Sequence, residues 1–162
     1  MTLLLIAVAA LLLLIAGAPF IPSHNRDIAK VFDKLNPADG RTFVDLGSGD
    51  GRVLRYARQY GFKVEGYELN PVLWLWSKIK LGWSTKINLR PWQQAELSHV
   101  DLVYIFSTTW HLKNLNRQRF PESATVIIYG PQPDSWKGLE STGVGSAIIY
   151  WPVAQAEPNK LT

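Results

Sequence analysis

The chain has 162 residues, a net charge of +4 and no cysteine. This length is typical of one domain with a sizeable hydrophobic core. The absence of cysteine excludes disulfides, zinc–cysteine sites and thiol catalysis. The positive charge favours acidic partners such as anionic lipid, nucleic acid or an acidic protein surface, although a mildly basic solvated surface has the same composition.

The N-terminus is strongly apolar. Residues 3–18 contain no polar side chain, and Pro19 to Pro22 extend the run to about 20 residues, within the ~17–25 that span a bilayer. A cleaved secretory signal, with Ala16-Gly17-Ala18 as its cleavage site, is one alternative, and a buried helix is another. Against it, no Lys or Arg precedes the run and a proline would follow the cut. Basic residues come afterwards, so we predict a single-pass membrane anchor over residues 1–22, with the domain on the cytoplasmic side.

A folded domain is predicted over residues 23–153, followed by a loose tail at 154–162. Its first element is a helix from about Arg26 to Leu35, for which Ser23 or Asn25 is the expected cap. A turn follows and leads into the first strand.

The segment from Phe43 to Glu68 is the most informative part of the sequence. It reads as a short apolar strand ending at Leu46, a glycine-rich turn over Gly47–Gly51, an amphipathic helix ending at Gly61, and a strand over Lys63–Glu68. This order predicts a right-handed βαβ unit, and such units bind ligands at the carboxyl ends of their strands.

Further strands are expected at 87–89, 101–106 and 124–129, with a last antiparallel edge strand at 146–153 and a loop at 130–136. The helix between the second and third strands, Val72–Leu81, is apolar around nearly its whole circumference. It must therefore be deeply buried or partly docked on something. The predicted fold class is α/β, a Rossmann-like domain with a mostly parallel sheet and an antiparallel edge strand, preceded by one transmembrane helix.

The glycine spacing distinguishes two classes of ligand. A dinucleotide fingerprint needs G-x-G-x-x-G, but Arg52 stands where the third glycine would be. Asp45, near the end of the first strand, suits a ligand with an ammonium group. Glu68, ending the second strand, can accept hydrogen bonds from both hydroxyls of a ribose. A zwitterionic amino-acid tail joined to a nucleoside is S-adenosylmethionine. The alternative is a degenerate or NAD-type Rossmann domain.

The combination resembles the first two motifs of class I methyltransferases, so we predict S-adenosylmethionine as the cofactor and no metal. Trp92 is a candidate to stack on the adenine, although packing alone would also explain it. The predicted cofactor-binding residues are Asp45, Leu46, Gly47, Ser48, Gly49, Gly51, Glu68, Leu69, Trp92 and Phe106.

The loop after the fourth strand borders the site in this topology. It supplies three candidates for contact with the substrate, Ser107, Trp110 and His111. His111 is considered as a catalytic base, against the alternative of an ordinary histidine at a helix start.

With these residues in hand, the chain resembles a small family of membrane-anchored lysine methyltransferases, whose best-known members modify the ATP synthase c-subunit and the adenine nucleotide translocase. The matching blocks are Pro19–Ser23, Val44–Arg52, Gly66–Pro71 and the strand Asp101–Phe106. The resemblance implies that Asp45, Gly47 and Glu68 hold the cofactor and that Pro19–Ser23 packs beside the substrate channel, which makes Ser23 a fourth substrate-facing candidate. The chain departs from the family at Arg90, where an acid is usual, and at 107–111, where the loop is usually more apolar.

The predicted function is therefore protein-lysine N-methylation of a membrane or membrane-proximal protein. Methylation of a small molecule or lipid headgroup is an alternative, and so is a tethered cofactor-binding or assembly module without turnover. Nucleic-acid methylation is disfavoured, because Phe106–Thr109 lacks the D/N-P-P-Y/F/W loop that clamps a flipped base and the basic residues are dispersed.

Overall fold

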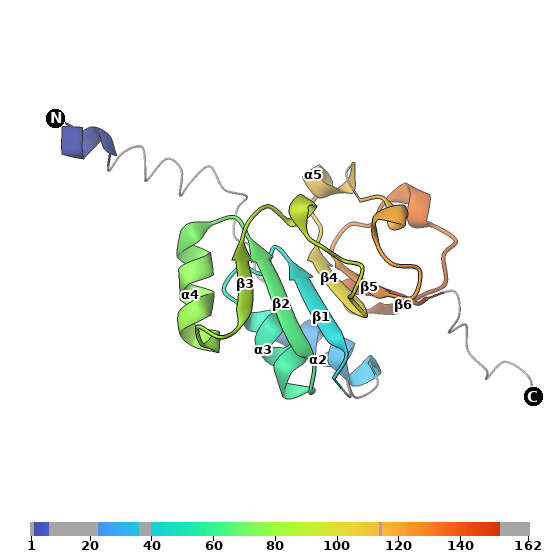
Figure 1. Cartoon of the computed structure of the whole chain (residues 1–162). Helices are drawn as coiled ribbons and strands as arrows, with labels where there is room; N and C mark the ends of the chain where they lie inside the picture. Colours follow the sequence, from blue (N-terminus) through green and yellow to red (C-terminus); the bar gives the residue numbers. More distant parts are fainter. Residues whose placement is uncertain (1, 7–22, 36–39, 114, 153–162) are drawn as a thin grey trace, which may run out of the picture.

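A seven-stranded sheet forms the centre of this computed structural model, which describes residues 2–6, 23–35, 40–113 and 115–152 (Figure 1). The strand order is β3-β2-β1-β4-β5-β7-β6. The first five of these pair in parallel, whereas β7 pairs antiparallel with both β5 and β6. The strands are β1 (Thr42–Leu46), β2 (Lys63–Glu68), β3 (Lys86–Leu89), β4 (Leu102–Phe106), β5 (Thr125–Tyr129), β6 (Ser141–Val144) and β7 (Ala147–Tyr150). The predicted mostly parallel α/β sheet is confirmed.

Three helices cover one face of the sheet. α2 (Asn25–Lys34) packs against α3 (Arg52–Gln59), and α3 lies on β1 and β2, while α4 (Pro71–Leu81) lies along β2 and β3. Phe32 of α2 and Phe43 of β1 are fully buried, with ring centroids 5.5 Å apart. This aromatic contact joins the helix layer to the sheet through the hydrophobic effect.

The other face carries only short helical turns among the described residues. They are η1 (Trp92–Gln94), α5 (Thr109–Leu112), η2 (Arg117–Arg119) and η3 (Asp134–Trp136). Trp136 is 1% exposed and meets Phe120 and Tyr150 edge to face, so one large side chain from a turn fills much of this second core. Short turns in place of full helices account for the small size of the domain.

The predicted βαβ unit is confirmed. β1 covers residues 42–46 and β2 covers residues 63–68. Gly61, with a φ of 86°, follows the last turn of α3 and leads into β2. Gly51 caps the start of α3 at a φ of 77°, and a Cβ there would lie 2.7 Å from the Leu81 side chain. Glycine is therefore needed at this position both for its backbone conformation and for the close packing of α4.

The predicted antiparallel strand at 146–153 is present as β7, and the antiparallel edge of the sheet is confirmed, but the prediction that this strand is single and outermost was wrong. The chain forms a hairpin in which Gly145 and Ser146 connect β6 to β7, and β6, not β7, lies at the edge of the sheet. Gly145 has a φ of 60°, as a tight hairpin turn requires. Because β6 is short, contains a glycine and is mostly exposed, it lacks the apolar alternation by which strands are recognised.

The cap predicted for α2 was also wrong. His24 occupies the N-cap without a side-chain bond, Asn25 is the first helical residue, and the Ser23 hydroxyl instead contacts Tyr104. The deep burial considered for the helix at 72–81 was wrong, because only Ser77 and Leu81 of α4 are buried, and its docking on a partner stays a prediction.

The predicted anchor lies largely outside the described residues, as does the tail at 154–162. Residues 2–6 are helical, and Leu3 to Ile6 are exposed. Among the helices of the described ranges, none combines the length and apolarity needed to cross a bilayer.

Candidate functional site

The segment Gly47–Gly51, here called the glycine loop, connects the end of β1 to the start of α3. The backbone N–H groups of Gly47 and Ser48 both donate to the Tyr67 carbonyl oxygen at 2.9 Å, which holds the loop against β2. Gly47 has a φ of 92°, and a Cβ at this position would meet no atom within 4 Å. The loop therefore leaves open space beside the backbone at the carboxyl end of β1.

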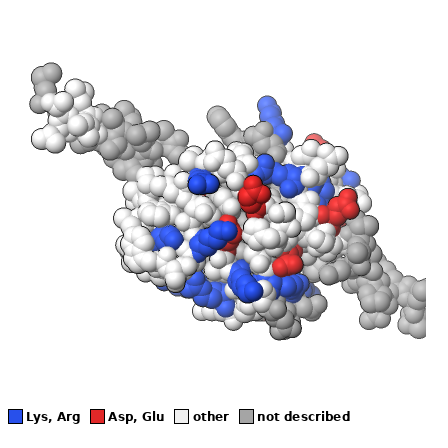
Figure 2. All heavy atoms as spheres, in the orientation of Figure 1, with Lys and Arg blue, Asp and Glu red and all other residues white. Residues whose placement is uncertain are grey.

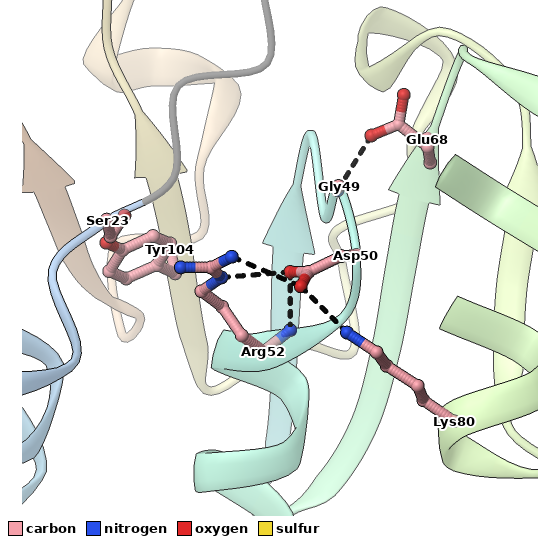
Figure 3. A network of polar contacts seen from close by, with 7 residues as sticks. All are labelled: Ser23, Gly49, Asp50, Arg52, Glu68, Lys80 and Tyr104. Carbon is pink, nitrogen blue, oxygen red and sulfur yellow. Dashed lines mark hydrogen bonds and ion pairs between the residues drawn. The ribbon is translucent and has the colours of Figure 1, made fainter. Parts of the chain in front are cut away.

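Glu68, the last residue of β2, reaches back across this end of the sheet (Figure 3). One oxygen of its buried carboxylate accepts from the Gly49 N–H at 2.7 Å, and the other accepts from the Asn70 N–H at 2.7 Å. A carboxylate has about four lone-pair positions, so each oxygen keeps capacity for one further donor. Glu68 thus holds two backbone groups and can still accept two hydroxyl hydrogens.

Asp45 lies one residue before the end of β1 and is 2% exposed. It is paired in register with Gly66 of β2 and with Tyr104 of β4. Burial, followed by the nearby charges of Glu68 and Asp50, raises the pKa of Asp45 well above its ordinary value. A cationic group placed beside it would reverse this effect and favour the ionised carboxylate.

Two tyrosines attach the chain entering the domain to the same end of the sheet. The Ser23 Oγ and the Tyr104 Oη lie 2.7 Å apart in a buried contact between residues separated by 81 positions. The Tyr129 hydroxyl donates to Asp27 at 3.1 Å and accepts from the His24 N–H at 3.3 Å. Ser23 is therefore attached to β4 through Tyr104, the residue of that strand that is the register partner of Asp45.

An ionic network lies beside the glycine loop. The Asp50 carboxylate binds the Arg52 guanidinium and the Lys80 ammonium, each at 3.0 Å, so it links the start of α3 to α4 (Figure 3). Burial acts to raise the pKa of Asp50, but the hydrogen bonds from Arg52 and Lys80 outweigh it and leave that pKa below its ordinary value. These groups, with Asn25, Gly51, Arg55 and Leu81, line a pocket of about 220 Å³.

The remaining predicted cofactor residues occupy varied environments at the carboxyl ends of the strands. Leu46 is buried in the core and Leu69 is exposed. Trp92 has the Arg119 guanidinium 5.3 Å from its ring centroid, and Phe106 stacks on Tyr129 at 5.4 Å. Their contact with a cofactor stays a prediction.

The loop that follows β4 begins with Ser107, which is 1% exposed. Its N–H donates to the Tyr129 carbonyl at 2.8 Å, and its hydroxyl has no partner among the described residues. The hydroxyl of Ser48, in the glycine loop, is also buried and also has no hydrogen-bond partner among the described residues. Trp110 and His111 fall in α5, but their side chains lie outside the described part of the chain.

Sequence reasoning missed the pairing of Ser23 with Tyr104 and the joining of α3 to α4 through Asp50. Tyr104 reads as one apolar position of a buried strand, and nothing local predicts a partner 81 residues away. The sequence did contain a signal for a role of Asp50. This acid stands two residues before Arg52, at the start of the predicted helix, where a negative charge is favourable.

Some known proteins are similar to this chain in sequence, and others are similar to it in fold. No protein-family model matches the chain. The lysine N-methyltransferase of the ATP synthase c-subunit from Caenorhabditis elegans is 31% identical over 156 residues, covering 82% of this chain and 78% of that protein. The chain belongs to the family of ATP synthase c-subunit lysine N-methyltransferases.

Relatives in this family differ in length. The rat (Rattus norvegicus) lysine N-methyltransferase of the ATP synthase c-subunit is 33% identical over 125 residues, which cover 75% of this chain and 49% of the rat protein. The chain thus spans about half the length of that relative. The predicted lysine methyltransferase family is confirmed, whereas the membrane anchoring predicted with it stays a prediction.

A solved structure supports the fold independently. The crystal structure of an RNA methyltransferase from Salinibacter ruber in complex with S-adenosyl-L-homocysteine matches with a TM-score of 0.70 at 18% identity, covering 88% of this chain and 99% of that one. This likeness shows the Rossmann-like methyltransferase fold. At such identity it carries no information on the substrate.

Proposed function

We propose that this chain is an S-adenosylmethionine-dependent methyltransferase whose cofactor lies across the carboxyl ends of β1 and β2. One observation carries the proposal: buried acids stand at the ends of these two adjacent strands, Asp45 on β1 and Glu68 on β2, on either side of the glycine loop. Asp45 is placed to receive the ammonium of the amino-acid part. Glu68 is placed to accept the two ribose hydroxyls.

The residues present suit such a ligand in further respects. The space beside Gly47 allows close approach to the backbone. Buried hydroxyls without partners are unusual in folded proteins, and within the described residues the hydroxyls of Ser48 and Ser107 have none. A polar ligand would supply the missing partners.

We propose a protein lysine as the methyl acceptor, supported by the names of the relatives. When bound, S-adenosylmethionine supplies a methyl group on a positively charged sulfur. The protein positions the acceptor amine, an effect worth up to ~7–11 kcal/mol of the barrier. Desolvation of a lysine amine beside a cation lowers its pKa, so the neutral amine would form without a dedicated base.

We also propose that residues 1–22 anchor the protein in a membrane, with the domain on the cytoplasmic side. The support is the uninterrupted apolar run at 3–18 and the basic residues that begin at 24. An anchor so close to Ser23, which contacts the sheet directly, favours a lysine near the membrane surface in a membrane protein. Alkaline carbonate extraction tests the anchor, because an anchored protein stays in the pellet.

The activity test incubates the full chain and cofactor tritiated on its methyl group with a membrane fraction. The proposal expects label in a protein band and methyl-lysine after acid hydrolysis. Asp45→Asn should abolish this label, whereas Asp134→Asn, which removes a remote, exposed carboxylate, should leave it unchanged.

The other outcomes of this test are informative. Label in the organic phase would replace the lysine by a lipid or small-molecule acceptor, and label in RNA would replace it by a nucleic acid. Cofactor binding with no transfer to any fraction would favour a tethered binding module.

A further inference from the structure

α4 presents apolar side chains to solvent along its outer face. They form a stripe, here called the α4 stripe, that consists of Leu69, Val72, Leu75, Trp76, Ile79 and Trp83. Within α4, the spacing of three and four residues places Val72, Leu75, Trp76 and Ile79 on one side, and Leu69 and Trp83 flank the two ends of the helix. Ile79 is 60% and Trp83 66% exposed. In the described part of the chain, the other large apolar side chains exposed to solvent are Leu3 to Ile6, Leu89 and Leu139.

The inner face of α4 already accounts for its attachment to the domain. Ser77 and Leu81 are buried against the glycine loop, and the Trp74 indole N–H donates to the Ile87 carbonyl at 2.9 Å. The attachment of α4 to the domain therefore does not require the exposed side chains of the α4 stripe. Contiguous exposed apolar surface of this kind marks an interaction site.

All charged residues in the segment that carries the α4 stripe are basic. Residues 69–95 contain Lys78, Lys80, Lys86 and Arg90 and no acid. Lys80 and Lys86 are paired with Asp50 and Glu65, so Lys78 and Arg90 carry the excess positive charge, with no ion pair to a carboxylate in the described ranges. Figure 2 shows the region over α4 as white spheres with scattered blue.

We propose that the α4 stripe is a membrane-contact surface that lies in the interface of a bilayer containing anionic lipid. Aliphatic and tryptophan side chains bordered by basic groups are what an interfacial helix needs, because the apolar groups enter the acyl boundary while the cations meet the headgroups. The surface is distinct from the proposed N-terminal anchor, and it does not depend on the proposed methyl transfer.

Two observations favour this occupant over two others. A second copy of the chain would bring the same excess of positive charge against itself, which opposes pairing through this face. The N-terminal segment of the same chain is a further alternative, but Leu3 to Ile6, its described part, are exposed and do not cover α4.

The location suits a protein that acts at a membrane. α4 begins at Asn70–Pro71, directly after Glu68, and the chain enters the described domain at Ser23, which contacts Tyr104. The start of α4 thus lies at the carboxyl end of β2, and Tyr104 is the register partner of Asp45. Contact through α4 would therefore hold the site close to the lipid surface.

The absence of cysteine makes the test direct. Ile79→Cys and Leu139→Cys each introduce one labelling position in the full chain, and Leu139 stands just before β6 at the opposite edge of the sheet from α4. Each variant is labelled with the environment-sensitive fluorophore NBD and reconstituted into phosphatidylcholine–phosphatidylglycerol vesicles. Spin-labelled lipid then reports contact with the acyl region, and aqueous iodide reports exposure to water.

The proposal expects NBD at position 79 to lose most of its emission to spin-labelled lipid and to be protected from iodide, with the reverse at position 139. The contact should weaken in vesicles of phosphatidylcholine alone and in an Arg90→Gln background. Equal behaviour at the two positions would overturn the proposal. So would protection of position 79 from iodide without loss of emission to spin-labelled lipid in the same vesicles, because protein rather than lipid would then cover the stripe; a cross-linked dimer would indicate a second copy and its absence the N-terminal segment. Trp83→Cys serves as a second position on the stripe if Ile79→Cys does not fold.

Discussion

The Glu68 carboxylate accepts a hydrogen bond from the Gly49 backbone N–H at 2.7 Å, and this bond joins the end of β2 to the glycine loop that follows β1. The same carboxylate accepts from the Asn70 N–H, which precedes α4. One side chain therefore fixes the relative positions of the loop, the strand end and the next helix.

Glu68→Gln should weaken binding of S-adenosylhomocysteine and lower stability. The amide has one acceptor oxygen in place of two, so one backbone N–H loses a charged partner, and hydrogen bonds to charged groups contribute about 1.5–3 kcal/mol. In the complex a ribose hydroxyl also loses a charged acceptor, and the same range corresponds to an affinity loss of roughly 10- to 100-fold. Isothermal titration calorimetry of the full chain measures it, with the exposed Glu140→Gln as control. Unchanged affinity in Glu68→Gln would remove this carboxylate from the cofactor site.

Asp45 should make both stability and ligand binding depend on pH. Burial raises its pKa, so the unfolded chain loses this proton at a lower pH than the folded chain does. Between the two pKa values the unfolded state binds fewer protons, and stability therefore falls as pH rises toward the folded pKa. Asp45→Asn should remove this loss and raise the Tm of the unliganded protein above that pH, whereas Asp134→Asn should not.

Binding of a ligand with an ammonium group should show the opposite trend. The cation favours the ionised form of Asp45, so affinity should increase as pH rises through the raised pKa, and binding should release a proton. Calorimetry in buffers with different ionisation enthalpies measures that proton. The account of Asp45 fails if proton release persists in Asp45→Asn.

Gly51→Ala should destabilise the domain more than Gly138→Ala. Both glycines have a positive φ, of 77° and 94°, but a Cβ at 51 lies 2.7 Å from the Leu81 side chain, whereas a Cβ at 138 meets nothing within 4 Å. The difference isolates the steric contact between the glycine loop and α4, and overpacking of this kind costs about 1–3 kcal/mol. Urea denaturation measures it, and equal losses in the two variants would contradict the packing.

The buried contact between Ser23 and Tyr104 should appear as a coupling energy. Ser23→Ala or Tyr104→Phe alone leaves one buried hydroxyl without its partner, which costs about 1–3 kcal/mol. The double variant removes both hydroxyls and should cost less than the sum of the single variants. Additive losses in a double-mutant cycle would mean that the hydroxyls do not depend on each other.

Local sequence patterns predicted the first half of the fold well. The apolar run of β1, the closely spaced glycines and the acid ending β2 all act within about 25 residues, where spacing alone determines the structure. The same patterns placed Asp45, Glu68 and the glycine loop at one end of the sheet.

Features that depend on distant partners could not be predicted in this way. The contact between Ser23 and Tyr104 joins residues 81 positions apart, and Trp136 in a predicted loop fills the core beneath Tyr150. β6 lies mostly exposed at the edge, so its residues need no apolar alternation. The apolar circumference of α4 was visible, but only the fold shows which side remains uncovered.

A crystal structure of the full chain with S-adenosylhomocysteine tests the central claim most directly. The account predicts that both ribose hydroxyls donate to the Glu68 carboxylate and that the ligand's ammonium lies beside Asp45, with the backbone of the glycine loop against the ligand. A ligand bound elsewhere, or a Glu68 carboxylate that makes no contact with the ribose, would contradict it.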